Sequence, residues 1–142
     1  HKNLERHRNY ITFTYMKIEV SNGELLDKLT ILELKLSKIK DSSKLDNIMK
    51  EWKILNDSVM NLFHVFGDKP LYTKIDELSE VNSNLWDVED YIRECEKEQR
   101  FDKEFIELAR SVYKLNDQRS KIKRHINILT KSKLIEEKSY SK

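Results

Sequence analysis

Residues that form turns and cross-links are scarce in this 142-residue sequence, which contains only two glycines, one proline and one cysteine. A β-sandwich or an α/β domain needs more turn residues between its strands, so the scarcity of Gly and Pro favours an all-α fold. A lone cysteine excludes an intrachain disulfide and fits a reducing compartment. No apolar run has the length of a membrane span or the layout of a signal peptide, so we expect a cytoplasmic protein without a membrane partner.

Acidic and basic residues nearly balance, with 27 Lys and Arg against 25 Asp and Glu. A net charge of +2 does not predict binding to nucleic acid. Charged residues make up 37% of the chain and hydrophobic residues 38%, a ratio typical of thin helical bundles with much surface per residue. The length suits one domain of ordinary size.

The first 20 residues differ in character from the rest. Residues 1–15 are interpreted as a flexible arm or as an addition to the natural protein, because Met16 suits a natural start. Between residues 10 and 20, Ile11, Phe13 and Tyr15 alternate with threonines, which is typical of a β-strand. A lone strand needs a partner, such as its copy in a second subunit. The alternative is an extended arm that lies on the helices.

Helix-start and helix-stop signals divide residues 16–142, which we interpret as a single helical domain. Ser21 and Glu24 have the spacing of a capping box. Gly67 favours a helix end, Pro70 a helix start and Asp102 an N-cap. Between these signals, apolar residues recur at alternating intervals of three and four, which predicts amphipathic helices.

The four predicted helices are long enough to pack along one another. Because short turns join them, we expect neighbouring helices to be antiparallel, in an up-down-up-down four-helix bundle of long helical hairpins. The last two helices are longer than the first two, so their hairpin should protrude and favour a homodimer. The predicted ranges are about 21–40, 44–65, 70–98 and 102–131.

Polar side chains interrupt the apolar stripe of every predicted helix. Folding each hairpin at its turn places four of them at neighbouring heights, and Glu89, about two turns nearer the loop, leans toward Arg119 across the last hairpin. We therefore predict one buried polar layer through the bundle, with three further polar residues along its edge. The layer consists of Lys28, Asn56, Asn82, Glu89 and Arg119, and its edge of Arg93, Tyr113 and Asn116.

Two functions fit such a layer. Buried polar residues specify helix register and oligomeric state, and this favours a non-catalytic binding or oligomerisation module. Alternatively, Lys28, Arg93 and Arg119 offer donors to an anionic small molecule, such as a nucleotide or a sugar phosphate. If the layer is structural, removal of Glu89 should destabilise the fold.

Motifs for catalysis and cofactors are missing from the sequence. The four histidines lack metal-ligand spacing, and no phosphate-binding glycine loop or nucleophile elbow is present. We therefore expect no cofactor and no catalytic residue. The expected partner is a second copy of the chain, with another protein as the alternative.

Three blocks of sequence together carry a family resemblance: MKIEVSNGELLDKLTILELKLSKI from residue 16, LWDVEDYIRE from residue 85 and EFIELARSVYKLNDQRSKIKRHIN from residue 104. The chain resembles an uncharacterised family of short helical proteins of bacteria and phages, classed as a domain of unknown function. The resemblance covers nearly everything after residue 15 and implies no activity.

Overall fold

The computed structural model describes residues 16–67 and 69–139, and the regular structure in these ranges is entirely α-helical. The all-α prediction is confirmed for this part of the chain, and the helix boundaries agree with the predicted ones to about two residues. The helices are α2 (Asn22–Lys38), α3 (Ser42–Phe66), α4 (Lys69–Lys97) and α5 (Lys103–Leu129).

Side-chain caps set the starts of three helices. Ser21, Asp41 and Asp102 each accept hydrogen bonds from backbone amides in the first turn of α2, α3 and α5. These bonds satisfy amides that have no partner inside the helix. Gly67 ends α3 with a φ of 79°, a left-handed conformation that favours glycine. The local signals in the sequence therefore fix the element boundaries.

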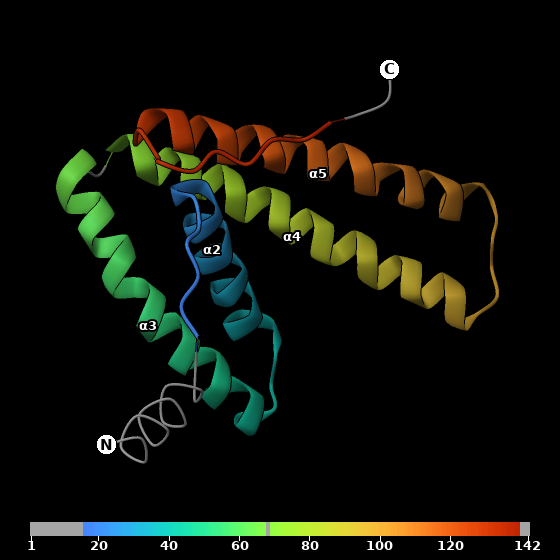
Figure 1. The fold of residues 1–142 in the computed structure, drawn as a ribbon. Coiled ribbons are helices and arrows are strands. Elements are labelled where there is room, and N and C mark those ends of the chain that lie inside the picture. Colours follow the sequence, from blue (N-terminus) through green and yellow to red (C-terminus); the bar gives the residue numbers. More distant parts are fainter. Residues whose placement is uncertain (1–15, 68, 140–142) are drawn as a thin grey trace, which may run out of the picture.

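Helix α2 lies at the centre of the helical arrangement. It contacts each of the other three helices. Figure 1 shows α5 returning alongside α4, whereas α3 diverges from this pair and lies beside α2. The molecule thus consists of two helical hairpins that meet at α2. The prediction of one antiparallel four-helix bundle is not confirmed by this arrangement.

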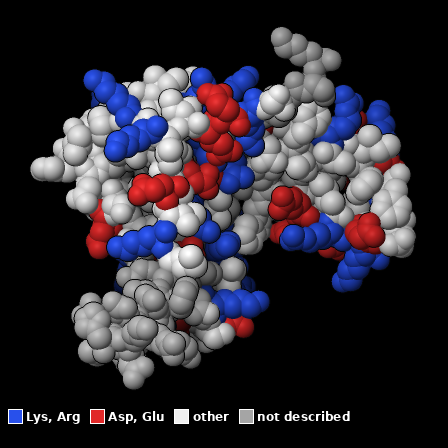
Figure 2. Space-filling view, viewed as in Figure 1, with Lys and Arg blue, Asp and Glu red and all other residues white. Residues whose placement is uncertain are grey.

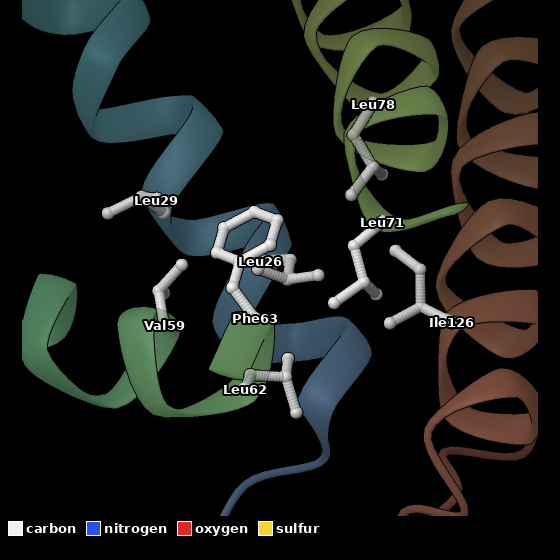
Figure 3. Packing of buried hydrophobic residues seen from close by; sticks show 8 residues of the cluster. All are labelled: Leu26, Leu29, Val59, Leu62, Phe63, Leu71, Leu78 and Ile126. Carbon is white, nitrogen blue, oxygen red and sulfur yellow. The ribbon is translucent and has the colours of Figure 1, made fainter. Parts of the chain in front are cut away.

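The hydrophobic core lies where the two hairpins meet. Leu26 of α2 is completely buried and packs among side chains from all four helices (Figure 3). Truncating such a leucine to alanine typically costs about 2–5 kcal/mol, because it leaves a cavity. The core cluster is Leu26, Leu29, Val59, Leu62, Phe63, Leu71, Leu78 and Ile126.

The hairpin of α4 and α5 extends well beyond this core (Figure 1). Only two of the 27 residues of α5 are buried, Ile126 and Asn127, and both lie near its C-terminal end. Along α4, Leu85 and Cys95 are buried, but the neighbouring Val88 and Ile92 remain half-exposed. Among the described residues, no third helix lies beside the far half of this hairpin (Figure 1).

Both ends of the described chain are extended. Residues 16–20 are exposed and form no strand, while residues 10–15 of the predicted strand lie outside the described residues, as does the rest of the predicted arm. After α5, residues 132–139 lack regular structure and run back beside that helix (Figure 1). Two ion pairs hold this segment, Lys123 with Glu136 and Arg124 with Glu137.

Candidate functional site

The carboxylate of Asp27 is the centre of a polar network between α2, α4 and α5. Asp27 is fully buried. Arg119 of α5 reaches it with Nε at 3.0 Å from both carboxylate oxygens, and Nη2 also donates to Oδ2. Asn82 of α4 donates from Nδ2 to Oδ1 at 2.9 Å. A bidentate guanidinium contact is the geometry that best compensates a buried carboxylate.

Thr30 completes this network from the next turn of α2. Its hydroxyl donates to the backbone carbonyl of Asp27 at 2.7 Å and accepts from Nδ2 of Asn82 at 2.9 Å. Among the described residues, every buried polar side-chain atom has a hydrogen-bond partner. Because buried polar groups without partners are costly, a closed network of this kind supports a unique packing of the helices.

Two cations beside Asp27 stay protonated at neutral pH. The hydrogen bond to Asp27 raises the pKa of the Arg119 guanidinium, although burial opposes it. Burial lowers the pKa of Lys123, but hydrogen bonds from its ammonium to Glu24 and Glu136 outweigh that effect and raise the pKa overall. The Nζ atom of Lys123 also lies 4.0 Å from Oδ2 of Asp27.

A second set of polar contacts joins the start of α2 to the end of α5. The amide of Gly23 donates to Oδ1 of Asn127 at 2.7 Å, and Nδ2 of Asn22 donates to Oγ1 of Thr130 at 2.9 Å. The amide of Asn22 donates to Oγ of Ser132 at 3.1 Å. Backbone of the two helices approaches so closely at Gly23 that a Cβ atom there would overlap the carbonyl oxygen of residue 123. Glycine is required for this approach rather than for backbone freedom.

A surface hollow of about 230 Å³ opens above the network. Helix α5 supplies four of the residues that line the hollow, α2 supplies one residue, and the segment after α5 supplies two residues. The lining is polar throughout and consists of Glu24, Asn116, Arg119, Ser120, Lys123, Glu136 and Lys138. Figure 2 shows basic and acidic side chains intermixed on the face in view, without one extended field of either sign.

The structure brings together part of the predicted polar layer. Asn82 and Arg119 share the Asp27 carboxylate, and Asn116 lines the hollow beside Arg119. Lys28 instead forms an ion pair with Glu51 of α3 at 3.3 Å.

The other predicted members do not form a buried layer. Glu89, Arg93 and Tyr113 are exposed, and Asn56 is half-buried on α3. The predicted pair of Glu89 with Arg119 is therefore wrong, since Arg119 contacts Asp27. The physical reason is that α2 also packs against α5 and brings the Asp27 carboxylate to Arg119, at the level of Asn82 on α4.

Sequence reasoning missed Asp27 and Thr30. The three-four spacing of α2 follows its leucines, Leu25, Leu29 and Leu32, but α2 also buries a second stripe. Gly23, Asp27 and Thr30 recur at positions i, i+4 and i+7, so they share one face of the helix. Small or short polar residues at this spacing, on a helix otherwise rich in leucine and lysine, are the signal that identifies the second buried face.

In the described ranges, no helix is both long and apolar enough to cross a membrane. The same ranges contain no group of three metal-binding side chains.

Comparison with known proteins gives a family but no activity. No curated protein and no solved structure matches the chain. Residues 16–142 match the family of unknown function DUF6165. This matched range includes all four helices, the Asp27 network and the hollow. The matched range starts at Met16, where the family resemblance of the sequence begins. With nearly its whole length matched, the chain belongs to the DUF6165 family.

Proposed function

We propose that this chain is a non-catalytic helical module that forms a homodimer through its α4/α5 hairpin. The observation that carries the proposal is the poor burial of α5, in which only Ile126 and Asn127 are buried. A long amphipathic helix gains most of its stability from packing its apolar face, so an incompletely covered hairpin favours a further partner.

An exposed apolar stripe on α5 is the proposed contact surface for that partner. Ile106, Ala109 and Tyr113 recur at positions i, i+3 and i+7, which places them on one helix face. All three residues are exposed, with 54% of Ile106 and 55% of Tyr113 accessible to solvent. The small side chain of Ala109 between two large ones suits close approach of another helix. We call these three residues the α5 stripe.

Charge complementarity favours a second copy of the chain as the occupant. Helix α4 carries eight Asp and Glu against four Lys and Arg, whereas α5 carries three against seven. In a two-fold dimer, each basic α5 can lie against the acidic α4 of the other protomer. The same pairing opposes contact between the two α5 helices, since like charges would meet.

The Asp27 network has a supporting role in this proposal. Asp27 belongs to the first hairpin, whereas Asn82 and Arg119 belong to the second, so their bonds hold the two hairpins in one orientation. A buried polar contact of this kind disfavours alternative packings in which the carboxylate loses its partners. The α4/α5 hairpin is thereby presented at a fixed angle to the rest of the molecule.

Size-exclusion chromatography with light scattering tests the dimer. The chain has a mass of 17.1 kDa, and we expect the wild-type particle to have twice that mass. Ile106→Lys places a charge in the α5 stripe and should give a monomer. Ile54→Lys is the matched control, because Ile54 of α3 is 65% exposed and lies outside the hairpin. A wild-type monomer at the highest soluble concentration contradicts the proposal, and so does equal dissociation in both variants.

The alternative function, binding of an anionic small molecule within the polar layer, gains less support. The donors of Asn82 and Thr30 and two nitrogens of Arg119 already serve the Asp27 region. A ligand inside the layer would have to displace these bonds. The adjacent surface hollow is the better place for such a ligand, because donors of α5 and of the segment after it line this hollow.

A further inference from the structure

One face of α5 presents four hydrogen-bond donors to the surface hollow. Asn116, Arg119, Ser120 and Lys123 occupy positions i, i+3, i+4 and i+7 and all line the hollow. They offer an amide, a guanidinium, a hydroxyl and an ammonium group. Convergence of four such groups on one polar hollow is the arrangement that binds an anion with several oxygens.

The Nη1 atom of the Arg119 guanidinium is available to donate to a ligand. Its Nε and Nη2 atoms donate to Asp27, and no hydrogen bond joins Nη1 to any described residue. Asp27 thus fixes the orientation of the guanidinium. A fixed donor loses less conformational entropy on binding than a free side chain does. The ammonium of Lys123 is also held in place, because Glu24 accepts a hydrogen bond from it and only 11% of the side chain is exposed.

The chain itself supplies an anion to this hollow. Glu136, from the segment that follows α5, accepts a hydrogen bond from Nζ of Lys123 at 3.1 Å. It lies 13 residues along the chain from Lys123, so its position results from the return of that segment beside α5. A carboxylate bound in this way indicates which chemistry the hollow accepts.

The segment that carries Glu136 is weakly held. Its apolar residues Leu134 and Ile135 are 45% and 42% exposed, so neither is anchored in the core. The carboxylates of its ion pairs, Glu136 and Glu137, are 46% and 71% exposed, so water screens these pairs and weakens them. Displacement of the carboxylate therefore costs little.

We propose that the hollow binds the phosphate group of a small phosphate monoester and that Glu136 is an intramolecular competitor for the same donors. When the side chain of Glu136 turns away and the backbone of its segment stays beside α5, three cations (Arg119, Lys123 and Lys138) face the carboxylates of Glu24 and Asp27. One positive charge is then left for the ligand. A phosphate has more acceptor oxygens than a carboxylate, so it engages more of the four α5 donors at once. The volume of about 230 Å³ admits a phosphate with a small substituent rather than a whole nucleotide.

The first test titrates the full chain with inorganic phosphate at constant ionic strength and follows backbone amide shifts by NMR. Acetate and chloride serve as comparison anions. We expect saturable shifts at residues 116–123 with phosphate, weaker binding of acetate and no saturable shift with chloride. Acetate binding as tight as phosphate binding would refute the phosphate assignment. Absence of saturable phosphate shifts in both the wild type and Glu136→Gln would refute the site.

Two matched variants test the competition. Glu136→Gln removes the internal carboxylate, and phosphate should then bind about fivefold more tightly, the effect of one unit charge at contact distance in water. Glu137→Gln removes the neighbouring charge, which pairs with Arg124 and does not line the hollow, and should leave the affinity unchanged. Equal tightening in both variants would show a general charge effect and contradict the role of Glu136.

A third variant adds charge to the hollow. Ser120→Asp should abolish saturable phosphate binding, because a new carboxylate takes the place of a donor. Ser120 is half-buried and lines the hollow, so the substitution does not place a charge in the hydrophobic core. A melting curve of the variant tests whether the fold is retained. Unchanged phosphate affinity in a folded Ser120→Asp protein would overturn the proposed location.

Discussion

The guanidinium of Arg119 donates hydrogen bonds to the carboxylate of Asp27, with Nε 3.0 Å from both oxygens, although the two residues lie 92 positions apart. The two ends of this pair differ in exposure. Asp27 has no accessible side chain, whereas 27% of the Arg119 side chain is accessible. The cost of breaking the pair should therefore depend on which partner is removed.

Arg119→Met should lower the free energy of unfolding by about 3–5 kcal/mol, because it leaves a fully buried carboxylate without its cation. Asp27→Asn should cost less, since the remaining guanidinium can turn toward water. Urea unfolding curves of the two variants measure the difference. If Asp27→Asn proves the more harmful change, burial of Asp27 does not govern the energetics of the pair.

A double substitution separates the charge from the packing. Asp27→Leu with Arg119→Met replaces the pair by apolar side chains and should recover part of the stability lost in Arg119→Met. The recovery is incomplete because buried Asn82 loses the Asp27 acceptor of its Nδ2. Glu89→Ala is the surface control and should change stability by less than about 0.5 kcal/mol, because Glu89 is exposed. A large loss in Glu89→Ala would restore the predicted Glu89–Arg119 pair and contradict the described network.

Gly23→Ala should destabilise the protein by about 1–3 kcal/mol, the usual cost of overpacking. On helix propensity alone the same change would stabilise by nearly 1 kcal/mol, so the sign of the effect is informative. The added methyl group would overlap the carbonyl oxygen of residue 123 and crowd Oδ1 of Asn127. Thermal melting of the variant measures the effect. An increase in melting temperature would show that α2 and α5 are not in close contact.

Salt should weaken the proposed dimer. The opposite charges of α4 and α5 attract each other across the interface, and the Debye length falls from about 8 Å at 0.15 M salt to about 3 Å at 1 M. We expect the dimer dissociation constant, measured by analytical ultracentrifugation, to rise over that range. A constant that falls with salt would assign the association to apolar contact alone and remove the argument for pairing α4 with α5.

Acid should weaken the start of α5 through Asp102. Hydrogen bonding from the Phe105 amide and then from Arg100 lowers the pKa of the Asp102 carboxyl below its ordinary value of 3.8. Because the folded-state pKa is depressed, the stabilisation is complete above pH 3.8 and is lost as the pH falls through the folded-state value. Asp102→Asn keeps a capping side chain without this titration. The stability advantage of the wild type over Asp102→Asn, measured by melting, should shrink in that acidic range, and a constant difference would contradict the assignment.

The sequence predicts the helices well because their ends depend on local chemistry. Ser21, Asp41 and Asp102 cap their helices through amides at most three residues away, and Gly67 supplies a backbone conformation that few other residues adopt. Such contacts are visible in any window of a few residues. The packing angle between the hairpins has no comparable local signature, so the sequence predicts the helices but not how the two hairpins cross.

The centre of the candidate site required knowledge of the packing. Arg119 and Asn82 are polar residues inside single apolar stripes, so helical periodicity identifies both. Asp27 lies outside the leucine stripe of α2 and becomes a core position only because α2 packs on two sides. Glu89 shows the opposite error, since its position in a stripe predicts burial, but in the described part of the chain no third helix covers it and it is exposed.

The docking of α2 onto α5 also bears on how the molecule is made. The first turn of α2 bonds to Asn127, Thr130 and Ser132, all more than 100 positions later in the chain. During synthesis on the ribosome, α2 therefore lacks these partners until about a hundred further residues have been added. The α4/α5 hairpin, whose contacts are nearer in sequence, can form before that, and attachment of α2 is expected to be the final step of folding.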